Sequence, residues 1–462
     1  MDAIPAVPAT PAAMELRGFR SGFFRALTGW ADANFESCEA LLCSPGPVAS
    51  TPTLSLDPVF RRSHGSLYKG LNLGQVDGEA MRDLLVAHRP GSWPLVFAVD
   101  ESVWPRNNAE TSPQRGFYHS SSKQWGGQPI VAGWSYQWIA QLDWALDSWT
   151  APMDAARIPP GADKVDATAK QIRALTGRLE RQDPGGPAPV FVFDAGYDPI
   201  ALTSELSCTR ACLVVRIRND RVFYTDPPEP RPGRPGRPPR HGHRRCCADP
   251  ATWPDPDQQL TAQDPRHGTV HVAAWHNLHP MLARRGHWAD HDQAPIIPGT
   301  VVRVDVEHLP KAAGGPNKTL WLWVAADQAG EADLDIWWRA YLRQFDIEHT
   351  FRFVKTTLGW TTPRLRTPEQ ADRWTWLILA AHTQLRLARP LVEDHRLPWQ
   401  RPARPGRLTP GRVRQGFRRT TPILGTPASP PKTSRAGPGR PKGTKTGPRE
   451  RHPALHAAEA RV

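Results

Sequence analysis

Apolar positions along this chain follow two periods, one typical of helices and one typical of buried strands. Helical spacing occurs in residues 13–42, 163–180, 333–360 and 369–389, and the run 333–360 predicts one long amphipathic helix. Short apolar runs, typical of buried strands, end at Asp100 and at Asp194. Residues 130–146 predict two strands of a meander, and further strands are expected near 212–218, 269–275, 301–306 and 319–325. Strands that alternate with helices in this order predict an α/β protein with a mixed sheet.

The same patterns divide the chain into segments. We expect a disordered lead (1–12), a helical N-terminal domain (13–90), an α/β core in two parts (91–218 and 319–390), an inserted β-rich subdomain (219–318) and a basic disordered tail (391–462). The inserted segment contains an arginine-, proline- and glycine-rich loop at 231–245 without apolar periodicity, which predicts extended backbone.

Three carboxylates are the candidate chemistry. An aspartate at the end of a buried strand loses hydration unless a partner compensates it, and both Asp100 and Asp194 stand there. Glu348 lies on the long predicted helix among cations, where a solvated face with i,i+4 ion pairs is the simpler interpretation of that helix alone. Mutual repulsion in a three-carboxylate cluster is relieved by divalent cations, and hard oxygen ligands favour Mg²⁺ or Mn²⁺.

In this order and spacing, Asp100, Asp194 and Glu348 resemble the DDE triad of bacterial insertion-sequence transposases. One subgroup carries a Tyr-x2-Arg-x3-Glu-x6-Lys (YREK) signature, which Tyr341, Glu348 and Lys355 match in register. Gln344 stands where that arginine is expected, with Arg343 beside it, so either the neighbouring residue supplies the charge or the signature is partly lost. The resemblance spans about residues 95–388.

The resemblance implies a fold, a reaction and partners. The fold would be a ribonuclease-H-like mixed sheet flanked by helices, and the reaction DNA cleavage followed by joining of the 3′-OH to target DNA. Two Mg²⁺ (or Mn²⁺) ions would be held by Asp100, Asp194 and Glu348, while Lys355 and Tyr341 would hold phosphates. The implied partners are double-stranded DNA, as terminal inverted repeats and target, and a second copy of the chain in a homodimer, at the nucleoid in a bacterial cytoplasm.

Three other carboxylates compete for these roles. Asp198 precedes Pro199 and is more simply a helix cap. Asp346 lies about 200° around a helix from Glu348. Glu101 is expected on the opposite face of the strand from Asp100, because side chains alternate along a strand.

Charge supports a nucleic-acid partner. The formal net charge is +13 and the pI about 9.8, which favours a polyanion, although an arginine-biased composition also contributes. Candidate DNA contacts are Arg343, Gln344 and Arg352 near Glu348, Arg234 and Arg237 in Gly-Arg-Pro sequences that resemble minor-groove hooks, and Arg440 in a similar sequence of the tail. The resemblance implies that the N-terminal domain (13–90) binds the terminal inverted repeats and that the inserted segment (219–318) helps to handle DNA. The alternative for each is that it only packs on the core.

Cysteines and leader sequences add little. Cys246 and Cys247 follow His241 and His243, so a zinc site is conceivable, but free thiols in a reducing compartment are the simpler expectation. We expect neither a signal peptide nor a membrane span, since no apolar run approaches the roughly 20 residues needed. Two alternatives to a transposase stay open: a domesticated, catalytically weak DNA-binding regulator, and a nuclease without strand transfer.

Overall fold

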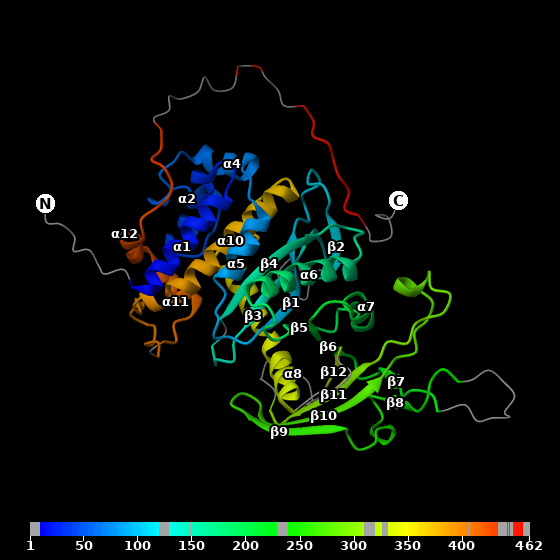
Figure 1. Cartoon of the computed structure of the whole chain (residues 1–462). Helices are drawn as coiled ribbons and strands as arrows, with labels where there is room; N and C mark the ends of the chain where they lie inside the picture. The colour runs from blue at the N-terminus through cyan, green and yellow to red at the C-terminus, as the bar shows by residue number, and fades with distance from the viewer. Residues whose placement is uncertain are drawn as a thin grey trace.

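The computed structural model of this chain is a mixed α/β structure organised around one large sheet (Figure 1). It describes residues 10–119, 129–147, 149–228, 239–308, 319–325, 331–404, 406–432, 441, 443 and 447–455. Within that part of the chain, ten strands form the large sheet and two more form a small one. No helix of the described ranges is both long enough and apolar enough to cross a bilayer. The predicted α/β class is confirmed.

Five strands form the half of the sheet that carries the first two candidate carboxylates. Their spatial order is β4-β3-β1-β5-β6, with β1 antiparallel to β3 and parallel to β5. The bounds are β1 Val96–Pro105, β3 Ile130–Leu142, β4 Thr150–Ile158, β5 Val190–Phe193 and β6 Cys212–Ile217. A short strand, β2 (Gly116–His119), shares the outer edge of β3 with β4. Among the four strands that precede helix Lys164–Gln182, all neighbours pair antiparallel, and the two strands that follow are parallel to β1.

The meander predicted within residues 130–146 is wrong in detail. That run is one long strand, β3, and the second strand of the pair is β4, which begins only at Thr150. Gly133, which favours a turn, instead permits a close approach, because a Cβ there would lie 2.2 Å from the carbonyl oxygen of Trp104 on β1.

The strands of the inserted segment continue the same sheet. β12 (Thr319–Val324) pairs antiparallel with β6, and the order then runs through β11 and β10 to β9 at the edge. The remaining bounds are β9 Gln258–Asp264, β10 Gly268–Leu278 and β11 Gly299–Val306, with β7 Val222–Tyr224 and β8 Arg244–Cys246 forming the small sheet and 3₁₀ turns at Pro250–Thr252 and Gly286–Trp288. Both faces of β12 are buried, since Leu322 packs in one cluster and Trp323 in another. The predicted β structure is present, but it extends the core sheet rather than standing as a sheet of its own.

Helices cover both faces of the first half of the sheet. α6 (Lys164–Gln182) and α7 (Pro199–Glu205) pack on the face that buries Phe97, Val99 and Phe191. α8 (Glu331–Gln344), α9 (Asp346–Thr356) and α10 (Pro368–Ala388) pack on the face that buries Ala98 and Val192. Adjacent residues of β1 thus belong to different cores, which places Asp100 and Glu101 on different faces.

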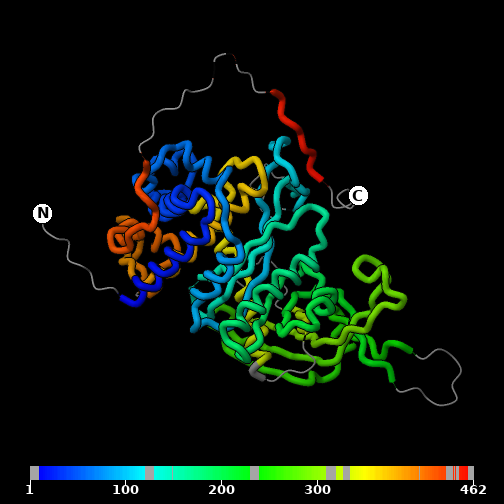
Figure 2. The backbone as a smooth tube through the Cα atoms, turned by 45° about the horizontal axis from the view of Figure 1, so that its top comes forward, coloured from blue at the N-terminus to red at the C-terminus, as the bar shows by residue number. Residues whose placement is uncertain are grey.

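The N-terminal helices pack around α10, as Figures 1 and 2 show. They are α1 Pro11–Ala26, α2 Ala31–Cys43, α3 Thr51–Leu54, α4 His64–Leu73 and α5 Gly78–Ala87. A buried ion pair joins α1 to α2, in which Arg20 contacts Glu39 at 2.5 Å, and the exposed Arg61 before α4 contacts the buried Glu36 of α2 at 2.7 Å. Helical structure was predicted here, but α10 sits among these helices and on β4 at once, so they share a core with the sheet.

The expectation of a disordered tail from residue 391 is wrong for residues 391–404 and 406–432. A 3₁₀ turn (Arg389–Leu391) leads to α11 (Pro410–Phe417), a second 3₁₀ turn (Arg418–Thr420) and α12 (Thr421–Leu424), which pack on the N-terminal helices. The reason is a short apolar set, Val413, Phe417 and Leu424, that is buried there. Arg414 is buried too and donates hydrogen bonds to the carbonyl oxygens of Leu41 and Gly46. Proline and arginine hid this periodicity in the sequence.

The cysteines form no disulfide with one another. Cys38, Cys43, Cys246 and Cys247 are buried, and burial raises the pKa of the Cys247 thiol to about 12. Within the described ranges, no three His, Cys, Asp or Glu side chains lie close enough together to hold one metal ion, so the zinc site considered for Cys246 and Cys247 finds no support there.

Candidate active site

Asp100 and Asp194 are brought together by the pairing of β1 with β5. The last pair in their parallel register is Val99 with Phe193, so the two aspartates are the next residues on neighbouring strands. Neighbouring strands lie about 4.8 Å apart. Asp100 is half-buried and accepts a hydrogen bond from the Glu101 amide at 2.8 Å, while Asp194 is exposed and accepts one from the Gly196 amide at 2.9 Å.

The long helix predicted over residues 333–360 is broken at Phe345. α8 ends at Gln344 and α9 begins at Asp346, with Phe345 between them and 57% exposed. At the break Phe345 lies in solvent, whereas Asp346 and Ile347 are buried. Tyr341 and Gln344 therefore lie on one helix, and Glu348, Arg352 and Lys355 on the next.

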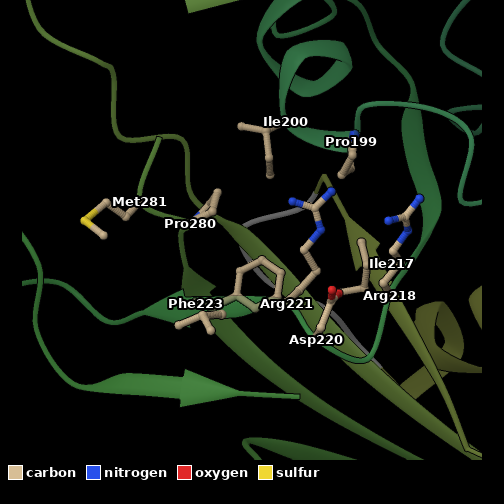
Figure 3. A pocket seen from close by; sticks show the side chains of 10 residues that line it. Pro199, Ile200, Ile217, Arg218, Asp220, Arg221, Phe223, Pro280 and Met281 are labelled. Carbon is tan, nitrogen blue, oxygen red and sulfur yellow. The ribbon is translucent and has the colours of Figure 1, made fainter. Parts of the chain in front are cut away.

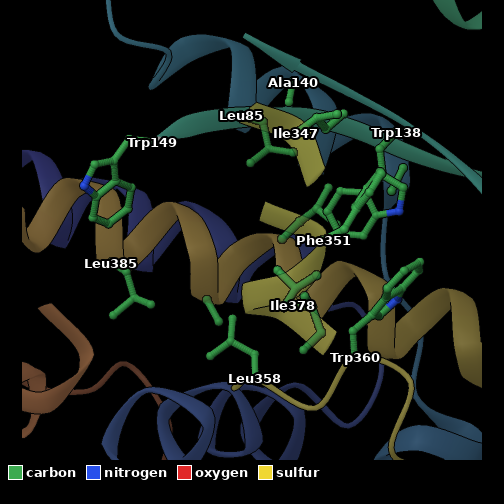
Figure 4. Packing of buried hydrophobic residues seen from close by; sticks show 14 of the residues in the cluster. Leu85, Trp138, Ala140, Trp149, Ile347, Phe351, Leu358, Trp360, Ile378 and Leu385 are labelled. Carbon is green, nitrogen blue, oxygen red and sulfur yellow. The ribbon is translucent and has the colours of Figure 1, made fainter. Parts of the chain in front are cut away.

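Aromatic packing anchors α9 above Asp100. Trp138 is the direct cross-strand partner of Asp100, and its ring meets the Phe351 ring edge to face with 5.7 Å between centroids. Trp360, just beyond α9, contacts Trp138 in the same way at 5.0 Å. Figure 4 shows Ile347 and Phe351 entering this cluster beside Ile378 of α10. The buried face of α9 thus fixes the height at which its exposed residue Glu348 stands over the sheet.

Electrostatics show that the three carboxylates share one neighbourhood. The pKa of Asp100 is well above its usual range, first because of burial and then because of the negative charges of Asp194 and Glu348. The side chain of Glu348 makes no hydrogen bond or ion pair with another side chain of the described part. Asp100 on β1, Asp194 after β5 and Glu348 on α9 are therefore electrostatic neighbours, and their role as a triad stays a prediction.

Two signature residues lie beside these carboxylates. Burial lowers the pKa of Lys355, while the charges of Glu348 and Asp100 act in the opposite direction. Its ammonium nitrogen is 5.8 Å from the centre of the Trp360 ring. The Tyr341 hydroxyl accepts a hydrogen bond from Arg216 at 3.2 Å, and burial raises the Tyr341 pKa, to which the charge of Asp194 also contributes.

The structure shows where Arg343 and Gln344 lie, the two residues at the departure from the signature. Arg343 is 8% exposed; its Nε is 2.7 Å from a carboxylate oxygen of Asp346, and it donates to the Asp147 carbonyl at 2.6 Å. Gln344 is half-buried and Arg352 is exposed. In the free protein, Arg343 thus holds α8 to α9, and its contact with DNA stays a prediction. Arg234, Arg237 and Arg440 lie outside the described residues.

The rival carboxylates have other partners. Asp198 caps α7 by accepting from the amides of Ile200 and Ala201. Asp346 is buried between Arg343 and Arg266, and burial raises its pKa to about 6. Glu101 pairs with Lys164 of α6 at 3.0 Å, on the face opposite to Asp100, as expected.

A basic groove runs from the Asp194 loop along β6 to β11. Its volume is about 660 Å³, and its charged lining residues are Arg216, Arg218 and Arg303 together with Asp220 and Asp305, of which Asp305 pairs with Arg303 at 3.0 Å. A neighbouring pocket of about 360 Å³ shares Arg218 with it (Figure 3). Figure 3 shows Arg221 of that pocket extending between Phe223 and the start of α7. These arginines were not predicted as site residues, although Arg216 and Arg218 alternate with buried residues at the end of a predicted strand, which is a signal for one exposed face.

A comparison with family models identifies the chain. A model described as DDE superfamily endonuclease matches residues 22–280, which is more than half of the chain. This protein belongs to that family. No curated protein matches the chain.

The family match covers only part of the site. In this DDE superfamily endonuclease the matched residues include Asp100 and Asp194 but end before Glu348. The position of Glu348 therefore rests on the structure, in which α9 carries it into the electrostatic neighbourhood of Asp100. In this chain, Asp100 within β1 and Asp194 after β5 lie on neighbouring parallel strands, and the arginine-containing groove begins at the loop that follows Asp194.

Proposed function

We propose that this DDE superfamily endonuclease is the transposase of a bacterial insertion sequence, which cuts the ends of its element and joins the freed 3′-OH to target DNA. The observation that carries the proposal is the position of Asp100 and Asp194 directly after the last paired residues of the parallel strands β1 and β5, with Glu348 near enough for its charge to raise the pKa of Asp100. In this structure the three carboxylates do not lie close enough together to hold one ion. Carboxylates that repel one another at a solvent-accessible site are unfavourable unless cations bind between them.

The catalytic core is proposed to be ribonuclease-H-like. Leaving out the short strand β2, the five strands in chain order are β1, β3, β4, β5 and β6, and their spatial order is third, second, first, fourth, fifth. Three antiparallel strands followed by two parallel ones support that fold. The carboxylates on the first and fourth strands support the assignment of Asp100 and Asp194.

The donor chemistry fits two Mg²⁺ or Mn²⁺ ions. All three side chains offer hard oxygen atoms, and two of the three, Asp194 and Glu348, are exposed. Asp100, Asp194 and Glu348 would hold these ions, and the mutual repulsion that raises the pKa of Asp100 would be relieved when they bind. Bound ions at such a site lower the pKa of the attacking water and stabilise the leaving oxygen.

The other residues of the site would bind and orient DNA. Lys355 is held by aromatic rings next to Glu348, so its ammonium can contact a phosphate close to the scissile bond. Tyr341, already paired with Arg216, would contact the strand that enters the groove, and Arg216, Arg218 and Arg303 would follow its backbone. Arg352 and Gln344 are proposed to contact phosphates on the exposed side of the two helices.

The proposed partners are double-stranded DNA, as terminal inverted repeats and target DNA, and a second copy of the chain in the active complex. The N-terminal helices and the inserted segment with Arg234 and Arg237 are proposed to contribute DNA contacts, and Arg440 to aid nonspecific binding. The proposed location is the nucleoid of a bacterial cytoplasm.

The test is cleavage of a labelled duplex that carries the native ends of the element, with and without Mg²⁺. We expect Mg²⁺-dependent nicks at the element boundary and, with a target plasmid present, joined products. Cleavage without joining would favour a nuclease without strand transfer.

A domesticated, catalytically weak regulator is the second candidate, and Gln344 in place of the signature arginine is the observation that favours it. Tight binding of the element ends without any cleavage in Mg²⁺ or Mn²⁺ would support that function and reject the transposase.

A further inference from the structure

A chain of buried polar side chains leads to the loop that carries Asp194. Tyr197, in that loop, donates to the Gln137 side-chain oxygen at 3.2 Å, and Gln137 donates to Gln171 at 2.8 Å. Gln171 donates to Asp154 at 2.8 Å, and Arg82 is ion-paired with the other oxygen of Asp154 at 2.9 Å. These hydrogen-bonded side chains thus connect α5 of the N-terminal helices, β4, α6 and β3 to the Asp194 loop.

This chain lies on the opposite face of the sheet from the candidate triad. Gln137 is the cross-strand partner of Glu101, whereas Asp100 is paired with Trp138. Glu101 and Gln137 therefore face α6, and Asp100 faces α9. None of these polar side chains can be a ligand of the proposed ions from that side, so their role must be exerted through the Asp194 loop.

Burial makes the polar chain costly unless every member is satisfied. Gln137 is 1% exposed, Asp154 4%, and Gln171 and Tyr197 6% each. Apolar residues of similar size would fill the same space without the loss of hydration. Satisfied networks of this kind specify one arrangement of the groups at their ends, because each bond restricts the next. The group at the exposed end is the Asp194 loop.

Lys164 provides a second attachment for the same loop. Its ammonium nitrogen lies 3.8 Å from the centre of the Tyr197 ring, donates to the Gly196 carbonyl at 3.3 Å and pairs with Glu101 at 3.0 Å. The other side of the Gly196 residue, its amide, donates to Asp194. Lys164 therefore holds Gly196, the residue whose amide contacts the Asp194 carboxylate, and it also contacts the ring of Tyr197, the residue that follows.

We propose that Tyr197 and Lys164 are positioning residues, which hold the Asp194 carboxylate in the orientation that binds a divalent cation together with Asp100. The proposal rests on the proposed function, because it takes Asp194 and Asp100 as the cation ligands. Partners that orient a ligand from the second layer typically change metal affinity about 10–100-fold when they are removed. The Gln137–Gln171–Asp154–Arg82 chain extends this support to α5, so the N-terminal helices contribute to the geometry of the site.

The decisive variant is Tyr197→Phe, which removes only the hydroxyl and keeps the ring under Lys164. Its matched control is Thr168→Val, since Thr168 is also buried and donates at 2.9 Å to the same oxygen of Gln137. Both variants remove a hydroxyl that contacts the same oxygen of Gln137, and Thr168 also contacts the Lys164 carbonyl within α6, but only Tyr197 belongs to the Asp194 loop. A second pair, Lys164→Met against the exposed Lys170→Met on the same helix, tests the other attachment.

Mn²⁺ binding to the DNA-free protein, followed by electron paramagnetic resonance, is the main readout. We expect Tyr197→Phe and Lys164→Met to weaken Mn²⁺ binding about tenfold, and the Mg²⁺ concentration for half-maximal cleavage to rise in parallel. Thr168→Val and Lys170→Met should leave both unchanged, and the melting temperatures of Tyr197→Phe and Thr168→Val should be alike.

Equal effects of Tyr197→Phe and Thr168→Val, or unchanged Mn²⁺ affinity in both Tyr197→Phe and Lys164→Met, would overturn the proposal. These outcomes are distinct from a failure of the proposed function. A wild type that does not cut its own element ends, but binds Mn²⁺ more tightly than Tyr197→Phe, would reject the transposase and keep the positioning role.

Discussion

The rings of Trp138 and Phe351 meet edge to face, and this contact sets the position of Glu348 relative to Asp100. Trp138 is paired with Asp100 across the two strands, and Phe351 follows Glu348 by three residues on α9. One ring therefore neighbours Asp100 and the other neighbours Glu348. The distance between two carboxylates that are far apart in sequence is thus governed by an apolar contact between two other residues.

The first prediction follows from this contact. Phe351→Ala should lower the free energy of unfolding by about 3–5 kcal/mol, because a buried aromatic ring leaves a cavity. It should also reduce cleavage more than DNA binding, since Glu348 loses its support. Urea unfolding and a gel-shift assay measure the two effects. The smaller change Phe351→Leu should retain most of the activity, and equal loss of binding and cleavage would argue against a role in placing Glu348.

The second prediction concerns the carboxylates themselves. Asp100→Asn, Asp194→Asn and Glu348→Gln should each abolish Mg²⁺-dependent cleavage of element ends and leave the affinity for DNA nearly unchanged. Asp335→Asn is the matched control, because Asp335 is a partly exposed carboxylate on α8 that pairs with Arg339 at 3.0 Å. Full activity of Glu348→Gln would show that another residue is the third ligand.

The third prediction separates two roles of Arg343. Because Arg343 is the nearer of the two cations that pair with the buried Asp346, its replacement by methionine leaves Asp346 with only Arg266 at 3.6 Å, and we expect a loss of roughly 3 kcal/mol in stability. The salt dependence of DNA binding should not change, since no phosphate contact is lost. Gln344→Arg, in contrast, should steepen the salt dependence. A flatter salt dependence of Arg343→Met with unchanged stability would instead identify Arg343 as the compensating phosphate contact.

The fourth prediction is a pH dependence of stability. His382 is buried against Trp149 and Phe353, and burial lowers its pKa to about 3. A histidine with a lowered pKa contributes stability above its unfolded pKa of about 6.5, and this contribution is lost as the pH falls toward 3. At pH 5 the loss should be about 2 kcal/mol relative to pH 7. Chemical denaturation of His382→Gln should show a smaller dependence over the same range, whereas an unchanged slope would exclude His382 as its source.

The fifth prediction tests the C-terminal helices. Truncation after residue 404 removes α11 and α12 and exposes the surface that buries Val413 and Phe417, so the melting temperature should fall by several degrees, about 2–4 °C for each kcal/mol lost. Truncation after residue 432 keeps both helices and should leave it nearly unchanged. Similar melting temperatures for the two truncated proteins would show that the segment contributes no stability.

The sequence alone determined the strand that carries Asp100, the strand that ends before Asp194, the helical residue Glu348 and the α/β class. The expectation that the first strand ends at Asp100 is wrong, since β1 continues to Pro105. Local patterns suffice for these features, because the spacing of apolar residues along the sequence indicates which segments form buried strands or amphipathic helices. They also sufficed to set Glu101 and Asp198 aside, because face alternation and capping are local rules.

Tertiary structure decided the rest. The break at Phe345 depends on the burial of Asp346 against Arg343 and Arg266, and Arg266 lies about 80 residues away in the chain, beyond the reach of helical periodicity. The order of α11 and α12 depends on a surface formed by the N-terminal helices, and the continuation of the sheet through β12 depends on its pairing with β6. The attachment of Tyr197 to Gln137 likewise joins residues from separate elements. A pattern along the chain specifies which residues avoid water, but only the packed structure specifies which partner each of them finds.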